Sequence, residues 1–384
     1  MSLEKKIIAI LKESLGDGSF PLHEPRFNGN ESLYVEACIA TTYVSSVGSY
    51  VNQFEKELAG YVGVKNATAT VNGTAALMVA LKLAGVKLGD EVLIPALTFV
   101  ATANAVHQLS AHVHFVDSCE ETFGIDPLSL RDWLKHIAEP SLGGYRNRIT
   151  GRKISALVPV HIFGHPCDID GLLAVAADFK LVMVEDASES LGSFYHGRHT
   201  GSFGLLSAVS FNGNKIITTG GGGAILTNNN HLAEHAKHLT TTAKIPHRWE
   251  YVHDEIGYNF RMPNINAALG CAQLERLSSF LASKRRLTNR YKKAFSNLEH
   301  VKLKQNSPGC NANYWLQTLV LDRLVERQLG DILKQTNDAG FMTRPAWKPL
   351  HLLRPYKDCQ RASLKVAESL SKRIINLPSS SGLA

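Results

Sequence analysis

Short apolar runs alternate with longer stretches of helical periodicity between residues 67 and 211, and this order constrains the fold most strongly. The runs are rich in Val and Ile, and several are nearly continuous in apolar character, as is typical of strands buried on both faces of a mostly parallel sheet. They cover Ala67–Val71, Glu91–Pro95, Val113–Asp117, Ile154–Val160, Leu181–Glu185 and Ala208–Phe211. This alternation predicts an α/β fold, in which ligands bind beyond the carboxyl ends of the strands.

The character of the sequence changes near residue 250. A long, charged helical region follows at Asn264–Leu298, and weaker strand-like pieces such as Trp315–Leu321 come after it. At the other end of the chain, the apolar residues of Leu3–Leu15 share one helical face. We therefore predict a large domain over residues 1–250, which includes an N-terminal helical segment, and a smaller α+β domain over residues 251–384.

Charge and hydropathy exclude several classes of protein. The chain carries 41 basic and 34 acidic residues, a net charge of +7 without a dense Lys/Arg block, whereas a nucleic-acid binder usually concentrates its charge in a patch. No apolar run reaches the roughly 18 residues of a membrane span. We expect a soluble, cytoplasmic protein that contacts neither nucleic acid nor membrane. Solvated surface charge explains the basic excess, and an anionic small substrate is the alternative explanation.

The six cysteines lie far apart and form no CxxC pair. This spacing fits neither a disulfide framework nor a zinc ribbon. Free thiols in a reducing compartment are the expected state, and no metal site is predicted.

A first motif with chemical content runs from Asn72 through Gly73, Thr74 and Ala75, where a strand ends and a helix begins. A helix N-terminus with small residues is a natural seat for a phosphate, and the Thr74 hydroxyl adds a polar group. An ordinary capped helix start is the alternative interpretation. Neither GxGxxG nor GxxxxGK[ST] occurs here, which disfavours a dinucleotide site or a P-loop.

Three further segments follow strands at the same predicted edge. Phe99 could cover a flat heteroaromatic ring, or could be a core residue. The acids of Glu185–Glu189 follow a buried-type strand and need a partner, which a cationic ring nitrogen would supply; an acidic first turn of a helix is the alternative. Lys215 lies in a polar turn before four glycines and could equally be an exposed lysine.

Taken in order, these segments supply a phosphate seat, a ring cover, a carboxylate for a ring nitrogen and a lysine. That is the equipment needed to hold pyridoxal phosphate as a Schiff base. The combination is much harder to explain by the separate alternatives than any one segment is.

The sequence resembles the DegT/DnrJ/StrS family of pyridoxal-phosphate-dependent sugar-nucleotide aminotransferases, from about Pro21 to Pro378. The motifs that carry this resemblance, beyond the segments above, are Gly48–Glu55, Gly89–Val92, Val160–Gly164, Glu185–Ala187 and Gly257–Met262. Ser210–Thr219 and Thr343–Lys348 are similar to a subgroup that makes UDP-linked 4-amino sugars in bacillosamine and legionaminic acid pathways.

The resemblance implies fold type I, a mostly parallel seven-stranded sheet sandwiched by helices. It also implies roles for individual residues. Pyridoxal 5'-phosphate would form an internal aldimine with Lys215, Asp186 would pair with its pyridine nitrogen, and Phe99 would stack on its ring. The remaining cofactor-binding residues would be Gly73, Thr74, Ala75 and Ser210 at the phosphate, Glu189 at the 3-oxygen, and Asn259 at the phosphate of the neighbouring subunit's cofactor.

The implied reaction moves an amino group from glutamate to a nucleotide-linked 4-keto-6-deoxy sugar, with a UDP-linked 2-acetamido-2,6-dideoxy-4-ketohexose as the predicted acceptor, for cell-surface glycans. His161, Arg344 and His351 are candidates for substrate contacts. The guanidinium of Arg344 suits a diphosphate or a carboxylate because it offers paired donors. A homodimer with shared active sites is implied. The alternatives are a sugar dehydratase and a non-catalytic regulatory protein that binds the cofactor.

The chain departs from its relatives in two places. Many relatives have Gln or His at the position of Glu189, so a contact between Glu189 and the cofactor's 3-oxygen requires a proton on one partner. Relatives also usually continue with a terminal helix beyond the segment where this sequence ends, at Ala384.

Overall fold

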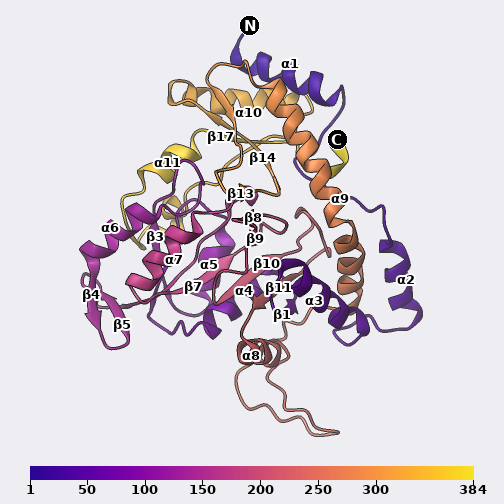
Figure 1. Cartoon of the computed structure of the whole chain (residues 1–384), viewed down its shortest axis with the longest axis vertical. Helices are drawn as coiled ribbons and strands as arrows, with labels where there is room; N and C mark the ends of the chain where they lie inside the picture. The colour runs from indigo at the N-terminus through magenta and orange to yellow at the C-terminus, as the bar shows by residue number, and fades with distance from the viewer.

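A central sheet of ten strands organises the computed structural model, which describes residues 1–384 (Figure 1). In spatial order its main path is β1 (Asn66–Thr70), β11 (Gly223–Thr227), β10 (Leu206–Ser210), β7 (Val182–Asp186), β6 (Lys153–Leu157), β2 (Glu91–Pro95), β3 (His112–Val116) and β16 (Gln360–Arg361). All neighbours on this path are parallel except the two pairs that β11 makes. The hairpin of β4 (Ala138–Ser141) and β5 (Gly144–Asn147) adds to β6.

The predicted mostly parallel seven-stranded sheet is therefore confirmed as the strands from β1 to β3, and six of them match the six predicted runs. The seventh strand, β11, was not predicted.

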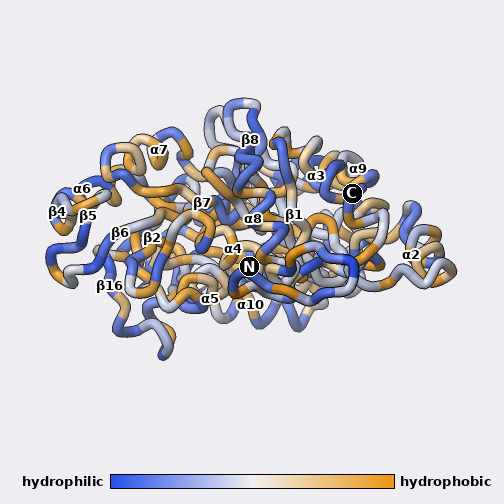
Figure 2. Tube along the Cα trace, turned by 90° about the horizontal axis from the view of Figure 1, so that it is seen from below, coloured by the Kyte–Doolittle hydropathy of each residue, from blue (hydrophilic) through white to orange (hydrophobic).

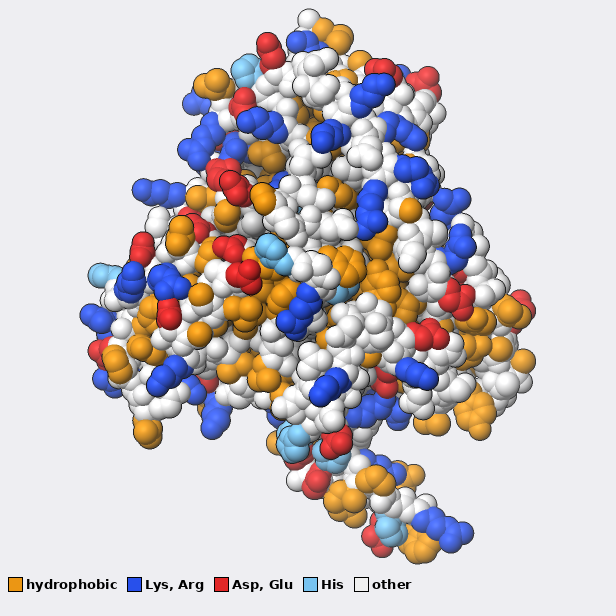
Figure 3. Space-filling model, in the orientation of Figure 1, with side chains coloured by type: hydrophobic (Ala, Val, Ile, Leu, Met, Phe, Trp, Pro, Cys, Tyr) orange, Lys and Arg blue, Asp and Glu red, His pale blue; other side chains and the backbone are white.

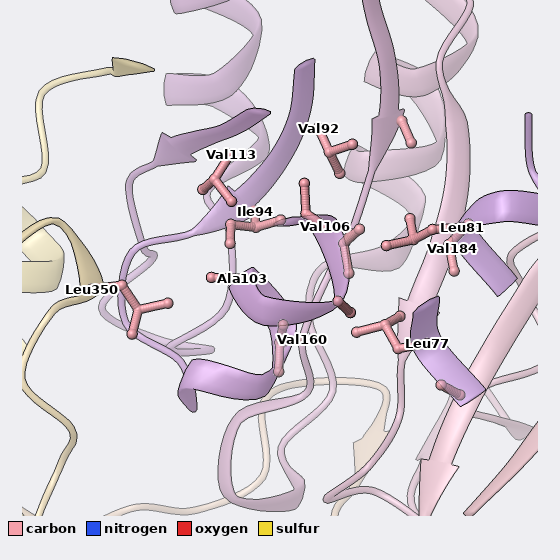
Figure 4. Packing of buried hydrophobic residues seen from close by; sticks show 14 of the residues in the cluster. Leu77, Leu81, Val92, Ile94, Ala103, Val106, Val113, Val160, Val184 and Leu350 are labelled. Carbon is pink, nitrogen blue, oxygen red and sulfur yellow. The ribbon is translucent and has the colours of Figure 1, made fainter. Parts of the chain in front are cut away.

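Helices cover both faces of the sheet because alternate residues of each strand point to opposite sides. Val92 and Ile94 of β2 pack with α4 (Gly73–Leu83) and α5 (Val100–His107), whereas Leu93 belongs to the cluster that contains α6 (Pro127–Ile137) and α7 (Ile169–Asp178). Figure 4 shows the first of these clusters, in which Val92 and Ile94 lie among side chains of α4 and α5. Hydrophobic segments gather in the middle of the trace around β7 and α4 (Figure 2).

Two further helices cover the β1 end of the sheet. Here α3 (Ser49–Val62) packs against α9 (Asn264–Ala294), and both share a core with β10 and β11. The helix α2 (Glu31–Ala40) also lies along α9. No helix of the structure is long and apolar enough to span a membrane.

The C-terminal part contains a separate antiparallel sheet of four strands in the order β12 (Val301–Leu303), β14 (Gln317–Leu321), β17 (Ile374–Leu377) and β15 (Arg344–Pro345). The N-terminal helix α1 (Leu3–Leu15) packs on this part, against α10 (Leu329–Asp338), at the top of Figure 1. Conversely, β16 joins the large sheet. The predicted division at residue 250 stays a prediction. The packing of α1 on the C-terminal part and the pairing of β16 with β3 both connect the two predicted domains across it.

Between α8 (Asn230–Thr240) and α9, the middle of residues 241–263 projects from the body as the extension at the bottom of Figure 3, whereas Met262 near the end of this stretch is buried in the core. The large side chains Trp249, Tyr251 and Ile256 are 68%, 80% and 81% exposed there. We call residues 241–263 the arm.

Candidate active site

A cavity of about 410 Å³ opens at the carboxyl ends of β1, β2, β7 and β10. Its wall is formed by Asn72, Gly73, Thr74, Leu77, Thr98, Phe99, Ala101, Thr102, Val160, Asp186, Ser188, Glu189, Ser210, Asn212, Asn214, Lys215, Trp315 and Trp347. This is the edge of an open α/β sheet at which ligands bind. The four predicted segments, at residues 72–75, 99, 185–189 and 215, therefore meet at one place.

The N-terminus of α4 forms one end of the cavity. Asn72 is the N-cap, and its side chain accepts a hydrogen bond from the backbone N–H of Ala75 at 2.8 Å. The first backbone N–H groups of a helix lack intrahelical partners, so those of Gly73 and Thr74 are available to an anion. A Cβ on Gly73 would lie 2.9 Å from the Cβ of Ser210, so the backbone approaches Ser210 more closely than another residue would allow.

Ala75 does not take the predicted place at a phosphate. It is buried, it is absent from the cavity wall, and its N–H is already bound by Asn72.

Asp186, the last residue of β7, presents its carboxylate to the cavity. It is 6% exposed, accepts a hydrogen bond from the Thr102 hydroxyl at 2.8 Å, and accepts one from the Ser188 N–H at 3.2 Å. No lysine or arginine pairs with Asp186, so a cationic ring nitrogen would complete its environment.

Lys215 reaches the cavity from the segment between β10 and β11, where the sequence predicts a polar turn. Its Nζ lies 3.5 Å from Oε1 of Glu189 and 3.9 Å from the centre of the Trp315 ring. The Trp315 indole N–H donates to the Asn214 carbonyl at 2.7 Å, which fixes the ring beneath the lysine. The lysine is thus held by a carboxylate and an aromatic face.

Glu189 is a buried carboxyl whose second oxygen accepts the Phe163 N–H at 2.8 Å. Burial raises the pKa of Glu189, and the positive charge of Lys215 opposes that shift. Nearby Asp186 adds to the rise. Two carboxyl groups of one wall are therefore placed in different environments.

Glu189→Gln is expected to raise the Tm of the cofactor-free protein at neutral pH. A carboxyl with a higher pKa in the folded than in the unfolded state destabilises the fold once it ionises. The gain should therefore vanish as the pH falls below the ordinary glutamate value of 4.5. Thermal melting at neutral and acidic pH measures it, and an equal gain at both would contradict the raised pKa.

Phe99 also lines the cavity and is 54% exposed, so its ring is accessible to a ligand. Its ring centre is 6.4 Å from that of Trp347, which in turn stacks on Phe163 at 4.9 Å. Phe99, which is predicted to stack on the cofactor ring, is thus the first of three aromatic side chains that contact one another in a row.

His161 is not brought to the cavity. It is fully buried, its Nε2 donates to Glu185 at 3.1 Å, and its Nδ1 accepts the Cys167 N–H at 3.2 Å. Both ring nitrogens of His161 are therefore engaged inside the protein. The predicted substrate contact is corrected to a structural role behind the wall.

His351 is also absent from this cavity. It is 5% exposed, and its Nε2 lies 3.0 Å from Glu368 beside a separate groove with Lys357 and Arg361. Its Nδ1 has no hydrogen-bond partner, so the predicted substrate contact of His351 stays a prediction outside this cavity.

Arg344 and Asn259 lie outside the cavity wall in different ways. Arg344 is exposed and lines a neighbouring cavity, where its guanidinium donates to Asn337 and to the Thr343 carbonyl. Asn259 is exposed on the arm and bridges to Thr241, so a contact with a cofactor in another subunit stays a prediction.

Sequence reasoning did not single out Thr102, Asn214 and Trp315 as site residues. Thr102 lies three positions after Phe99, and the first turn of α5 places its hydroxyl at Asp186. Trp315 comes from the C-terminal part, about 100 positions after Lys215. Only the folded chain brings these residues together.

The wall fits pyridoxal phosphate. The free amides of Gly73 and Thr74 suit a phosphate, the Asp186 carboxylate lacks a cationic partner, Phe99 offers an accessible ring, and Lys215 supplies an amine.

Comparison with known proteins agrees with this geometry. A profile described as the DegT/DnrJ/EryC1/StrS aminotransferase family matches residues 25–384. GDP-perosamine synthase of Caulobacter vibrioides is 37% identical over 360 residues, which cover 94% of this chain and 92% of that protein. The putative pyridoxal phosphate-dependent aminotransferase EpsN of Bacillus subtilis is 36% identical over 367 residues, covering 94% and 91%.

A crystal structure of an aminotransferase of this family from Brucella abortus superposes with a TM-score of 0.83 at 27% identity, covering 92% of this chain and 91% of that one. The fold and the site together define a fold type I aminotransferase of the pyridoxal-phosphate-dependent class. The chain belongs to the DegT/DnrJ/EryC1/StrS aminotransferase family.

Proposed function

We propose that the protein transfers the amino group of glutamate to a nucleotide-linked 4-keto-6-deoxy sugar, in the synthesis of a cell-surface glycan. The observation that carries this proposal is the meeting of Lys215, Asp186 and the N-terminus of α4 in one cavity. A phosphate, a ring nitrogen and an aldehyde carbon of one cofactor would each find a suitable group there.

Each residue has a defined task in this proposal. Lys215 would hold the cofactor covalently through Nζ, and its free amine would move a proton to and from the substrate carbon. Asp186 holds a proton on the ring nitrogen, with Thr102 fixing its orientation. Gly73 and Thr74 bind the phosphate through their N–H groups. The bound cofactor supplies an electron sink for the carbon next to the transferred nitrogen.

The nucleotide of the acceptor separates two versions of the proposal. The resemblance of Ser210–Thr219 and Thr343–Lys348 to a subgroup favours a UDP-linked 2-acetamido sugar. The printed name of the Caulobacter vibrioides relative favours a GDP-linked sugar instead. Both versions share the ketone chemistry and the amino donor.

A direct assay tests the proposal and this choice. The enzyme loaded with pyridoxal phosphate is incubated with glutamate and a panel of UDP- and GDP-linked 4-keto-6-deoxy sugars, and the products are identified by mass and NMR. An amino sugar from one member of the panel supports the proposal. Loss of water from the sugar would identify a dehydratase, and no exchange with any member would identify a regulatory protein.

The arm supports a homodimer with shared active sites. Large apolar side chains such as Trp249, Tyr251 and Ile256 are mostly exposed on it, and such patches mark association sites. The six free cysteines are typical of reducing compartments, and we place the enzyme in the cytoplasm.

Mixed dimers are expected to regain activity when Lys215→Ala and Asn259→Ala chains are refolded together. If Asn259 serves the partner's cavity, one of the two cavities in a mixed dimer contains neither substitution. Turnover of the mixture against each variant alone measures this effect. No recovery in a proven mixed dimer would place Asn259 in the cavity of its own chain.

A further inference from the structure

A second cavity, of about 500 Å³, adjoins the first. The two share Asn214, Trp315 and Trp347 as lining residues, so they border on each other close to Lys215. The second cavity brings together the loop before α2, which contains His23, and the segment around Arg344 in the C-terminal part. No role in the proposed function has been assigned to it.

His23 is the unusual group of this cavity. Both of its ring nitrogens are enclosed and have no hydrogen-bond partner, although the backbone of Asn214 lies nearby. An enclosed polar group without a partner is costly, and such groups in native proteins call for a reason. A ligand that fills the cavity would supply the missing partner.

The charges around His23 select the kind of ligand. Burial lowers the pKa of His23 well below its ordinary value, and the positive charges of Lys284 and Lys215 lower it further. Arg344 lines the same cavity, and no aspartate or glutamate does. Arg344 is therefore the only lining side chain with a permanent charge, and its positive charge suits an anion.

The remaining wall selects the shape of that anion. Apolar side chains line it, including Leu22, Leu316 and Met342. Such a surface accommodates a short hydrocarbon chain, whereas a diphosphate would leave most of its oxygens without donors. A carboxylate at the end of two or three methylenes matches both the charge and the wall.

We propose that the second cavity binds the distal carboxylate of the amino donor, with His23 donating a hydrogen bond to it and Arg344 supplying the opposite charge. This inference rests on the proposed aminotransfer from glutamate. It makes His23 a residue that selects a dicarboxylic donor, one that the sequence did not indicate.

Glutarate is the probe, because it carries the same carboxylates as glutamate but has no amine to transfer. Its affinity for the cofactor-loaded enzyme is followed by calorimetry and by the fluorescence of the tryptophans, two of which line the cavity. His23→Leu is expected to weaken binding by about tenfold, the effect of losing one hydrogen bond to a charged group. His23→Gln, which retains a donor, should recover part of it.

A matched control is His165→Leu. His165 is also buried and also has an unpartnered ring nitrogen, but it lines neither cavity. His165→Leu should leave the affinity for glutarate unchanged. His23→Leu should leave the affinities for UDP and GDP unchanged. Melting temperatures of all variants verify that they are folded.

Three outcomes decide between the ideas. Unchanged glutarate affinity in His23→Leu, or an equal loss in His165→Leu, would overturn the assignment. A loss of UDP or GDP affinity instead would give the cavity to the sugar nucleotide and would overturn it too. Glutarate binding that depends on His23 in an enzyme that exchanges no amine with glutamate would overturn the proposed function and leave the carboxylate site standing.

Discussion

Lys215→Ala is expected to lower the turnover of amino transfer by about 10³-fold or more, the scale of losing a positioned proton-transfer group. Lys215 is the only lysine in the cavity wall, and it is held in place by Glu189 at 3.5 Å and by the Trp315 ring. The substitution removes both the amine that binds the cofactor covalently and the base that moves the proton. No neighbouring side chain can replace either function.

Two controls separate chemistry from folding. Lys215→Arg retains the positive charge beside Glu189 but has no free amine, so it should be about as inactive. Lys135→Ala, at an exposed surface lysine, should be fully active. Borohydride reduction followed by peptide mapping should find the cofactor's mass on Lys215 of the native enzyme only. Native-like turnover of Lys215→Ala would refute the assignment.

The local pattern of apolar residues predicts most strands of the large sheet, because these strands are buried on both faces and are nearly continuous in apolar residues. It does not predict strands that form only because of their pairing partners. The strand β11, Gly223–Thr227, follows a run of glycines and is a strand because β1 and β10 flank it on both sides. The two residues of β16 are a strand only through β3, from which they are more than 240 positions distant.

The site shows the same division. Groups that directly follow a strand end, such as Asp186 and Phe99, could be predicted because the strand ends meet at one edge. Residues supplied by distant parts of the chain could not, as Trp315 and His23 show. His161 illustrates the opposite error: it also follows a strand, but its side chain points back into the interior toward Glu185.

Consecutive carboxylates of β7 therefore have unlike functions, although the sequence presents them as one acidic cluster. Successive side chains of a strand point to opposite faces. Asp186 thus faces the cavity, while Glu185 faces the interior and accepts hydrogen bonds from His161 and from the N–H groups of Gly201, Phe203 and Gly204, the last three at 2.7–2.8 Å. Burial alone would raise the pKa of Glu185, but these hydrogen bonds and His161 lower it below its ordinary value.

Glu185→Ala should consequently lower the free energy of unfolding by about 3–5 kcal/mol, the largest stability loss that we predict, because the buried His161 and three backbone N–H groups lose their acceptor together. A lowered pKa also means that the contribution of Glu185 is fully present above its ordinary pKa of 4.5 and is lost as the pH falls through its folded value. Denaturant unfolding of native protein and variant, compared at neutral and acidic pH, should show the difference in the free energy of unfolding shrink in acid.

The neighbouring Asp186→Asn is the matched control: it should retain stability and lose turnover, because its carboxylate serves the cavity and accepts only two hydrogen bonds. Equal stability losses in the two variants would contradict the division of tasks between the two carboxylates.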